Sequence, residues 1–419
     1  MVKIKGFKGI RPKIELAEKI ASHPYDVIDS NEARQMVKGN PYSFLHVVKS
    51  EVDLPEGIDL YSQEVYVKAA ENLKKMVVEG WLVQDKKDCI YIYRQIMKGH
   101  EQYGLVVGSS VQDYLDERIK IHELTREAKE KDRINHVKYT NANTGPVFLT
   151  YPQNLEINAI VQNIIEVSPD YDFTAPDSIQ HTMWIVSEES LITKLVGIFA
   201  EIPFTYVADG HHRSKSAAMV GEMRKNANPN HTGEEEYNWF LSVIFPANQL
   251  KILDYNRVVK DLNGYNVEEF MDKLLEKFEI QPLCCIHEAK PEKPTEFGMY
   301  IDGHWYNLKT KEECLDADDP VESLDVSILY NNILAPILGI GDLRKDNRID
   351  FVGGIRGLGS LERRVDSGKM AVAFALYPTS IKQLMSIADA GKIMPPKSTW
   401  FEPKLRSGLI VHDLEVATL

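Results

Sequence analysis

The stretch from Phe204 to Ala218 constrains the fold more than any other part of the sequence. Phe204 to Ala208 is a short apolar run that predicts a buried strand, and Asp209-Gly210 is a common turn pair. A helical pattern follows, with apolar residues at Ala217 to Met219. We therefore expect a strand, a tight turn and the N-terminus of a helix, which is a typical unit of an α/β protein.

Ionisable and hydroxyl side chains crowd the first turn of that helix. Its free backbone N–H groups and the positive end of the helix dipole favour anions, and the planar fork of an arginine suits phosphate or carboxylate. A solvated polar cap is the alternative, although a cap needs fewer such groups. The expected phosphate-binding residues are Gly210, His211, His212, Arg213 and Ser214. We expect Asp209 to hold a metal ion or to orient a donor.

The overall charge argues against a nucleic-acid surface. The 419 residues include 49 Lys and Arg against 62 Asp and Glu, a net charge of −13, with 43% hydrophobic residues. A diffuse negative field repels phosphate backbones but leaves room for a local basic pocket that binds a small anion. The length suffices for two or three domains of an ordinary soluble globular protein. No segment signals an oligomeric state.

Cysteine usage and hydropathy indicate a cytoplasmic protein that contacts no membrane. The four cysteines form no Cys-x-x-Cys pair, no apolar run approaches the length of a membrane span, and Met1 to Gly6 lacks a signal-peptide core. His122-Glu123 begins like a zinc-protease motif, but that motif needs a histidine at position 126, where Arg126 stands. We therefore expect neither zinc nor a disulfide.

Periodicity along the rest of the chain predicts mixed sheets with helices. Leu60 to Trp81 has the apolar stripe of a helix, and two apolar runs around a polar turn at Lys98-Gly99 predict a strand pair. Phe44 to Val48 is expected to be a strand. We expect an N-terminal α/β region at 1–112, a central anion- and nucleotide-binding module at 113–225, and a C-terminal α/β region at 226–419. An Asn- and Pro-containing linker at 226–233 sets the last boundary.

Several stretches of the sequence resemble known families. The run Asp209 to Arg213 after a strand is similar to the nucleotide-phosphate motif of the ParB/sulfiredoxin-like superfamily, which includes free-serine kinases with an Asp-Gly-His-x-Arg run. Nearly the whole chain also resembles the bacterial and archaeal family DUF1015. The stretches that carry this second resemblance are His23 to Ile28, Asn40 to Ser43, Thr140 to Pro146 and Pro395 to Lys404.

The superfamily resemblance implies a phosphotransferase. It implies that the donor phosphates sit on Gly210 to Arg213, that Arg213 and His212 balance the charge of the transferring group, and that Asp209 positions Mg²⁺. Glu123 corresponds, by its order along the chain, to the glutamate that removes the proton of the acceptor hydroxyl. The alternative for Glu123 is a surface carboxylate that the helix dipole favours at a helix N-terminus. Catalytic roles are thus expected for Glu123, Asp209 and His212.

Two further groups of residues are expected to contact the substrate. His122 and Arg126 flank Glu123 in the sequence. Lys397, Ser398 and Thr399 lie on a proline-stiffened strip that suits a lid over a phosphate or a small polar compound, because proline reduces the entropy lost on ordering. The alternative for this strip is a C-terminal strap whose aromatic residues fill the core.

We expect a phosphotransferase that uses ATP or ADP with Mg²⁺ and acts on a small hydroxyl metabolite, with free L-serine as the leading candidate. Its partners are then a nucleotide and a small-molecule substrate. Two other functions fit the same anion site. One is a non-catalytic ParB-like adaptor that binds nucleotide without turnover, and the other is a phosphatase or nuclease.

Overall fold

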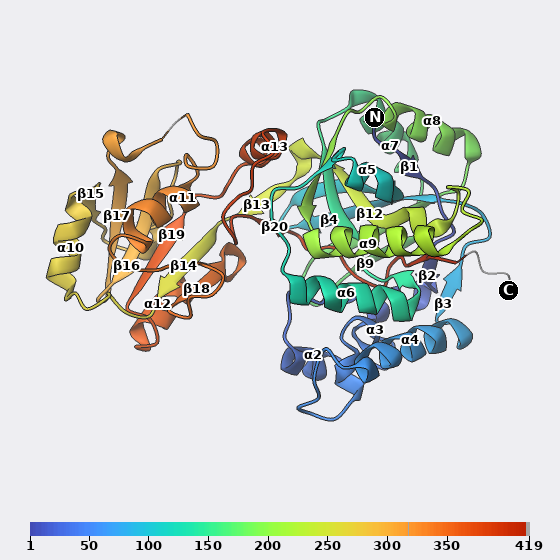
Figure 1. The fold of residues 1–419 in the computed structure, drawn as a ribbon, viewed down its shortest axis with the longest axis horizontal. Helices are drawn as coiled ribbons and strands as arrows, with labels where there is room; N and C mark the ends of the chain where they lie inside the picture. The colour runs from blue at the N-terminus through green and yellow to red at the C-terminus, as the bar shows by residue number, and fades with distance from the viewer. Residues whose placement is uncertain (317, 416–419) are drawn as a thin grey trace. The chain divides into compact units, whose positions relative to one another are not determined.

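The computed structural model of the protein describes residues 1–316 and 318–415, which form two compact units (Figure 1). The first unit comprises residues 1–250 and 403–419, of which the last four lie outside the description. The second unit comprises residues 251–402. Strands and helices alternate in both units, and the expected α/β class with mixed sheets is confirmed.

The first unit is organised around a nine-stranded sheet. Its strands are β1 (Ile4–Lys5), β4 (Ile90–Met97), β5 (His100–Ser110), β6 (Ile119–Lys120), β8 (Val147–Tyr151), β9 (Tyr171–Thr174), β10 (Gln180–Val186), β11 (Thr205–Asp209) and β12 (Trp239–Pro246). They lie in the order β6-β11-β8-β12-β5-β4-β10-β9, and β1 pairs with β5. The β6–β11 and β8–β12 pairs are parallel, and the other pairs of this sheet are antiparallel.

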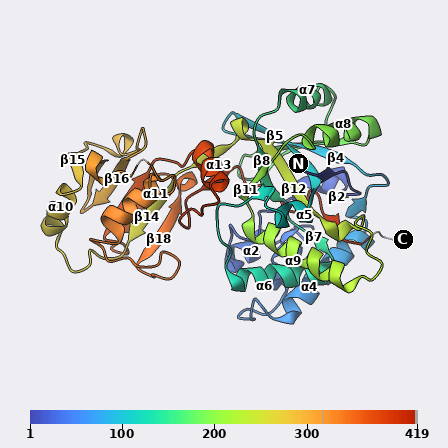
Figure 2. The ribbon, with the colours of Figure 1, turned by 45° about the horizontal axis from the view of Figure 1, so that its top comes forward.

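Helices and two small sheets surround this sheet. The helices are α1 (Ala17–Ile20), α2 (Ser30–Met36), α3 (Leu45–Val48), α4 (Gln63–Val78), α5 (Val111–Leu115), α6 (Glu127–Thr140), α7 (Leu155–Ile164), α8 (Glu189–Phe199) and α9 (His211–Ala227). The small sheets pair β2 (Ile10–Pro12) with β3 (Leu82–Gln84) and β7 (Ala142–Asn143) with β21 (His412–Asp413). Helix α6 packs on α9 and α4 packs on α6, and Figure 2 shows this stack from a second direction.

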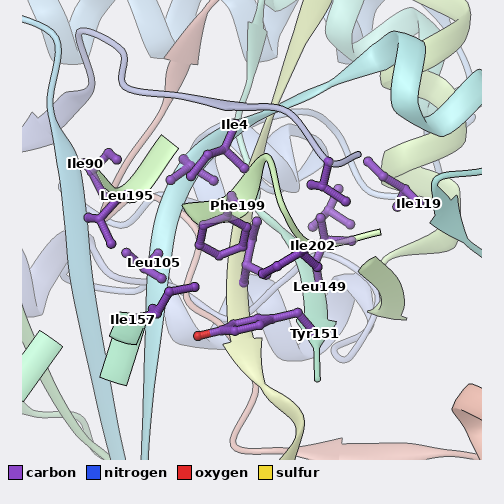
Figure 3. Packing of buried hydrophobic residues seen from close by; sticks show 14 of the residues in the cluster. Ile4, Ile90, Leu105, Ile119, Leu149, Tyr151, Ile157, Leu195, Phe199 and Ile202 are labelled. Carbon is purple, nitrogen blue, oxygen red and sulfur yellow. The ribbon is translucent and has the colours of Figure 1, made fainter. Parts of the chain in front are cut away.

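Apolar side chains from the large sheet and from α7, α8 and α9 form the core of the first unit. Figure 3 shows Tyr151 of β8 near Phe199 of α8, with their ring centroids 5.2 Å apart. Ile119 of β6 and Val207 of β11 are buried in the same cluster. Packing therefore fixes the two parallel strands β6 and β11, whose carboxyl ends lead toward the predicted site.

Two local predictions in the first unit have opposite outcomes. The strand pair around Lys98-Gly99 is confirmed, because β4 and β5 form an antiparallel hairpin that turns at these residues, both with positive φ. The strand predicted at Phe44 to Val48 is wrong, because α3 occupies Leu45–Val48. Phe44 to Val48 is a run of five residues, apolar except for the half-buried His46, and so short a run has no periodicity that separates a strand from a helix.

The second unit contains a six-stranded antiparallel sheet with the order β15-β17-β16-β19-β14-β18. These strands are β14 (Tyr255–Val259), β15 (Phe278–Pro282), β16 (Glu296–Ile301), β17 (His304–Thr310), β18 (Ile349–Gly353) and β19 (Val372–Leu376). Strands β13 (Lys251–Leu253) and β20 (Trp400–Glu402) pair separately. The helices are α10 (Val267–Leu275), α11 (Asp325–Leu329), α12 (Gly359–Asp366) and α13 (Ile381–Asp389).

The expected region boundaries at 112/113 and 225/226 both fall inside helices of the first unit, α5 and α9. One sheet holds strands from all three expected regions, namely β5, β11 and β12. The division between the units comes instead at residues 250/251 and again at 402/403. The chain therefore leaves the first unit after β12 and returns to it for its last described residues.

Candidate anion-binding site

The stretch that dominates the sequence folds as expected. Strand β11 ends at Asp209, Gly210 adopts a left-handed conformation with φ of 97°, and α9 begins at His211. No side chain caps this helix. The N–H groups at the first three helical positions have no acceptor within a helix, and the helix dipole adds positive potential there. The prediction of a strand, a turn and a helix N-terminus is confirmed.

The parallel pairing of β6 with β11 brings Glu123 to the same place. Ile119 lies opposite Thr205 in this pair, so both strands end at one edge of the sheet. Beyond β6, the ring of His122 contacts that of His211, with the centroids 4.4 Å apart and the planes perpendicular. Ligand atoms of His122, Glu123 and His211 all lie within 4.8 Å of one another. The neighbouring strands that a catalytic role for Glu123 requires are therefore present.

Arg213 folds back over the turn and contacts protein groups. Its Nη1 donates to the carbonyl of Pro146, and its Nη2 lies 3.8 Å from Oδ2 of Asp26 and 3.9 Å from Oδ2 of Asp209. Gly210 needs glycine for its conformation, and a Cβ there would also lie only 3.1 Å from Nε of Arg213. Nε is buried and has no hydrogen-bond partner. The arginine fork expected to face phosphate is thus partly committed to the protein.

Asp209 has a cationic partner that does not suit a magnesium ligand. Nζ of Lys404 donates to its Oδ2 at 3.0 Å. Burial alone would raise the pKa of Asp209, but the charges of Lys404 and Arg213 outweigh burial and hold that pKa well below its ordinary value. A Mg²⁺ ion at this oxygen would have to displace an ammonium group. The expected Mg²⁺ site at Asp209 therefore does not fit the residues present.

His212 is an acceptor and not the cation that the resemblance implies. Its Nε2 accepts a hydrogen bond from the backbone N–H of Arg126 at 3.1 Å. An imidazole nitrogen that accepts is unprotonated. Burial also lowers the pKa of His212. His212 therefore carries no charge to offset a phosphoryl group in this arrangement, and it fixes the residue from which α6 starts.

Ser214 is buried in the protein interior, contrary to its expected role in phosphate binding. Its side chain is fully buried, and its hydroxyl donates to the carbonyl of His211 at 3.1 Å. Ser214 shares the buried face of α9 with Ala217, Ala218 and Gly221. Residues three, four and seven positions apart lie on one helix face, so this correction follows from helical periodicity.

The residues expected to contact the substrate are distributed over both units. His122 is buried, and neither of its ring nitrogens makes a hydrogen bond of good geometry, whereas Arg126 is exposed. Lys397, Ser398 and Thr399 belong to the second unit. The hydroxyl of Ser398 donates to the carbonyl of Pro395 at 2.6 Å. A substrate contact from these three residues stays a prediction.

Three partners in the site were missed, although each lies in a stretch quoted for the family resemblance. Asp26 faces Arg213, the carbonyl of Pro146 accepts from Arg213, and Lys404 contacts Asp209. Asp26, Pro146 and Lys404, one residue from each of three such stretches, thus meet at one point of the first unit. That convergence was the available signal, because separate stretches that carry one resemblance often share one site.

A cavity adjoins Arg213 inside the first unit. Two arginines line it, Arg133 on α6 and Arg213 on α9. The ring of Tyr25 also lines the cavity, and the guanidinium of Arg133 lies 3.9 Å from the centroid of that ring. Apolar side chains, among them Val137 and Phe240, form other parts of the wall. Both arginines lie near carboxylates, Arg133 beside Asp132 and Arg213 beside Asp26, so the cavity wall carries paired charges.

No described helix is long and apolar enough to cross a membrane. No curated protein matches the sequence. Solved structures that resemble the chain include a conserved hypothetical protein from Pyrococcus furiosus, with 13% identity, 74% of this chain and 95% of that chain covered, and a TM-score of 0.36. A free serine kinase in complex with AMP has 13% identity, 75% and 92% coverage and a TM-score of 0.36. C-terminally truncated SbnI from Staphylococcus aureus has 12% identity, 74% and 86% coverage and a TM-score of 0.37.

These likenesses are too distant to transfer a function, and a ParB/sulfiredoxin-like module at 113–225 stays a prediction. The comparison with protein families gives a match over most of the chain. The model of the family DUF1015, described as a protein of unknown function, matches residues 4–327. This match spans the first unit up to β12 and about half of the second unit. The chain belongs to the DUF1015 family.

Proposed function

We propose that the protein transfers a phosphoryl group from ATP or ADP to a small hydroxyl compound at the β11–α9 turn. One observation carries this proposal: the uncapped N-terminus of α9 and the carboxylate of Glu123 lie at the same edge of one sheet. An anion site beside a carboxylate is the minimum that phosphoryl transfer to a hydroxyl requires. L-serine is the first acceptor to test, because of the resemblance of Asp209 to Arg213 to free-serine kinases.

In this proposal the backbone N–H groups of His211, His212 and Arg213 hold the donor phosphates. Glu123 takes the proton of the acceptor hydroxyl. The hydroxyl oxygen then bonds to the terminal phosphorus as the bond from that phosphorus to the nucleotide oxygen breaks. The products are a phosphate ester and the nucleotide with one phosphate fewer.

Charge at the site is balanced before any ligand arrives. Asp209 pairs with Lys404 and lies near Arg213. Phosphate oxygens would compete with the carboxylates of Asp209 and Asp26 for these two cations. Nucleotide binding should therefore loosen the contacts of Arg213 and Lys404, and affinity should fall as salt rises.

The test is to incubate the protein with ATP or ADP, with and without L-serine, and to follow phosphoserine by ³¹P NMR. Protein carrying Glu123→Gln, prepared in the same way, controls for contaminating kinases. Serine-dependent phosphoserine in the wild type alone supports the proposal. Nucleotide binding without turnover would favour the adaptor, and phosphate release from phosphoserine would favour the phosphatase.

A further inference from the structure

His122, Glu123 and His211 form a cluster of potential metal ligands. The first two follow β6 and the third opens α9, so the parallel β6–β11 pair brings them together from distant parts of the sequence. Their ligand atoms, one from each side chain, lie within 4.8 Å of one another. Two ligands at about 2.1 Å from one ion can be no more than about 4.2 Å apart. Small side-chain rotations would therefore bring all three onto a single ion.

Three of the four ring nitrogens of these two buried histidines have no hydrogen bond of good geometry. His122 is 2% exposed and His211 is 6% exposed. Both ring nitrogens of His122 and Nε2 of His211 are buried without a partner of good geometry. A buried polar group without a partner is costly, and such a group in a native protein calls for an explanation.

The other buried histidines of the described residues provide a contrast. His136 bonds the carbonyl of Val47 at 3.1 Å, His181 bonds the hydroxyl of Tyr93 at 2.7 Å, and His412 bonds Glu236 at 2.9 Å. The perpendicular packing of the His122 and His211 rings accounts for their apolar contact. This packing gives no hydrogen bond to either ring nitrogen of His122 or to Nε2 of His211, and a metal ion would satisfy one nitrogen of each ring.

We propose that His122, Glu123 and His211 bind one divalent first-row transition-metal ion, with Zn²⁺ as the probe. Two imidazoles and one carboxylate suit such an ion, whereas Mg²⁺ prefers oxygen ligands alone. Three protein ligands leave one tetrahedral position open, as in catalytic and not structural zinc sites. The sequence predicts no zinc, because its cysteines form no Cys-x-x-Cys pair and position 126 is an arginine. The structure supplies the second histidine, His211, from α9.

This inference does not rest on the proposed phosphotransfer, because an ion can bind with no nucleotide present. The two are nevertheless compatible. If Glu123 binds the ion through one oxygen, its other oxygen can still accept a proton. Metal binding and turnover are therefore measured separately, and either can fail alone.

The experiment titrates Zn²⁺ into the full chain after chelator treatment and dialysis, followed by calorimetry. We expect one ion per chain at this site, and a Co²⁺ titration should give the visible absorption of tetrahedral coordination. His211→Ala and Glu123→Gln should each weaken binding by at least about 10-fold, since even residues behind the direct ligands typically contribute that much. Glu123 is half-buried, so its variant keeps the test informative if His211→Ala fails to fold.

A second group in the described residues, Cys284, Cys285 and Glu288, also has metal-ligand spacing, and it provides the matched control. The double variant Cys284→Ser/Cys285→Ser should bind Zn²⁺ at the proposed site as the wild type does. The proposal is overturned if the wild type binds no Zn²⁺. It is equally overturned if binding survives both His211→Ala and Glu123→Gln, or disappears in the cysteine variant.

Discussion

Lys404 donates from Nζ to Oδ2 of Asp209 at 3.0 Å, across 195 residues of sequence. The contact joins the returning C-terminal segment to the end of β11. It fixes the carboxylate beside Arg213 and keeps positive charge near the first turn of α9. The same contact gives the first prediction.

Lys404→Met should destabilise the first unit and raise the pKa of Asp209. Removal of the ammonium leaves the largely buried carboxylate of Asp209 with less positive charge beside it. A hydrogen bond to a charged group is worth about 1.5–3 kcal/mol. Urea unfolding of Lys404→Met, Asp209→Asn and the double variant completes a double-mutant cycle. Its coupling energy isolates the Lys404–Asp209 interaction from the other contacts of Lys404. A coupling energy near zero would show that the pair adds nothing to stability.

Arg213→Lys should weaken nucleotide binding although the charge is kept. Lysine replaces a planar fork with a point charge, and the loss should be about 1–3 kcal/mol if the contact is charge-assisted. Arg224→Lys is the matched control, because Arg224 lies in the last turn of the same helix. Calorimetry should show weaker binding in the first variant and wild-type affinity in the second. Equal affinities in all three proteins would remove Arg213 from the phosphate site.

Glu123→Gln should reduce kcat by roughly 10²–10⁴-fold and leave the nucleotide Kd unchanged. Glutamine keeps the shape of the side chain but does not accept the proton. Glu127→Gln is the control, because Glu127 is exposed in the first turn of α6 and pairs with Lys131. Metal content is measured on the same samples, which separates loss of a base from loss of an ion. A Glu123→Gln enzyme with wild-type kcat would exclude the catalytic role.

The protein should become less stable as the pH falls from about 6.5 to 4. Nε2 of His181 accepts a hydrogen bond from Nε of Arg406 at 3.2 Å. A proton on this Nε2 would therefore point at the N–H group of Arg406. Burial, and then the charge of Arg406, lower the pKa of His181 to about 3, and burial lowers that of His136 to about 3. The unfolded chain then binds more protons than the folded one in this pH range. Each such histidine contributes a slope of about 1.4 kcal/mol per pH unit.

This pH dependence is measured by urea unfolding at intervals between pH 7 and 4.5. His181→Gln should show a shallower fall in the free energy of unfolding than the wild type, because one titrating group is removed. An unchanged slope would mean that His181 does not titrate with folding. Since the histidines are neutral at pH 7, stability in this range is greatest at its upper end.

The β11–α9 turn could be predicted because its signals are local. An apolar run, an Asp-Gly pair and a helical pattern follow one another within fifteen or so residues. The buried position of Ser214 is also predictable, because Ala217 and Ala218 follow it at helical spacing. The number of ionisable and hydroxyl groups at the turn does not by itself show which of them face a phosphate.

The partners of the site residues could not be predicted in this way. Asp26 and Lys404 reach the turn through the tertiary fold, and their presence changes what Arg213 and Asp209 are free to do. The second histidine of the proposed metal cluster comes from another element for the same reason. The local sequence pattern identifies residues whose side chains can bind phosphate or a metal ion. Long-range packing decides which of them already contact other protein groups.

The separation of Asp209 and Lys404 along the chain also has a consequence for synthesis. A ribosome makes β11 and α9, then the whole second unit, before it makes the segment that returns to the first unit. Until then Asp209 has no Lys404, and β7 lacks its partner strand β21. A nascent chain that stops before residue 403 therefore holds the anion site with one cation missing. The site reaches its final charge balance only after the second unit has been translated.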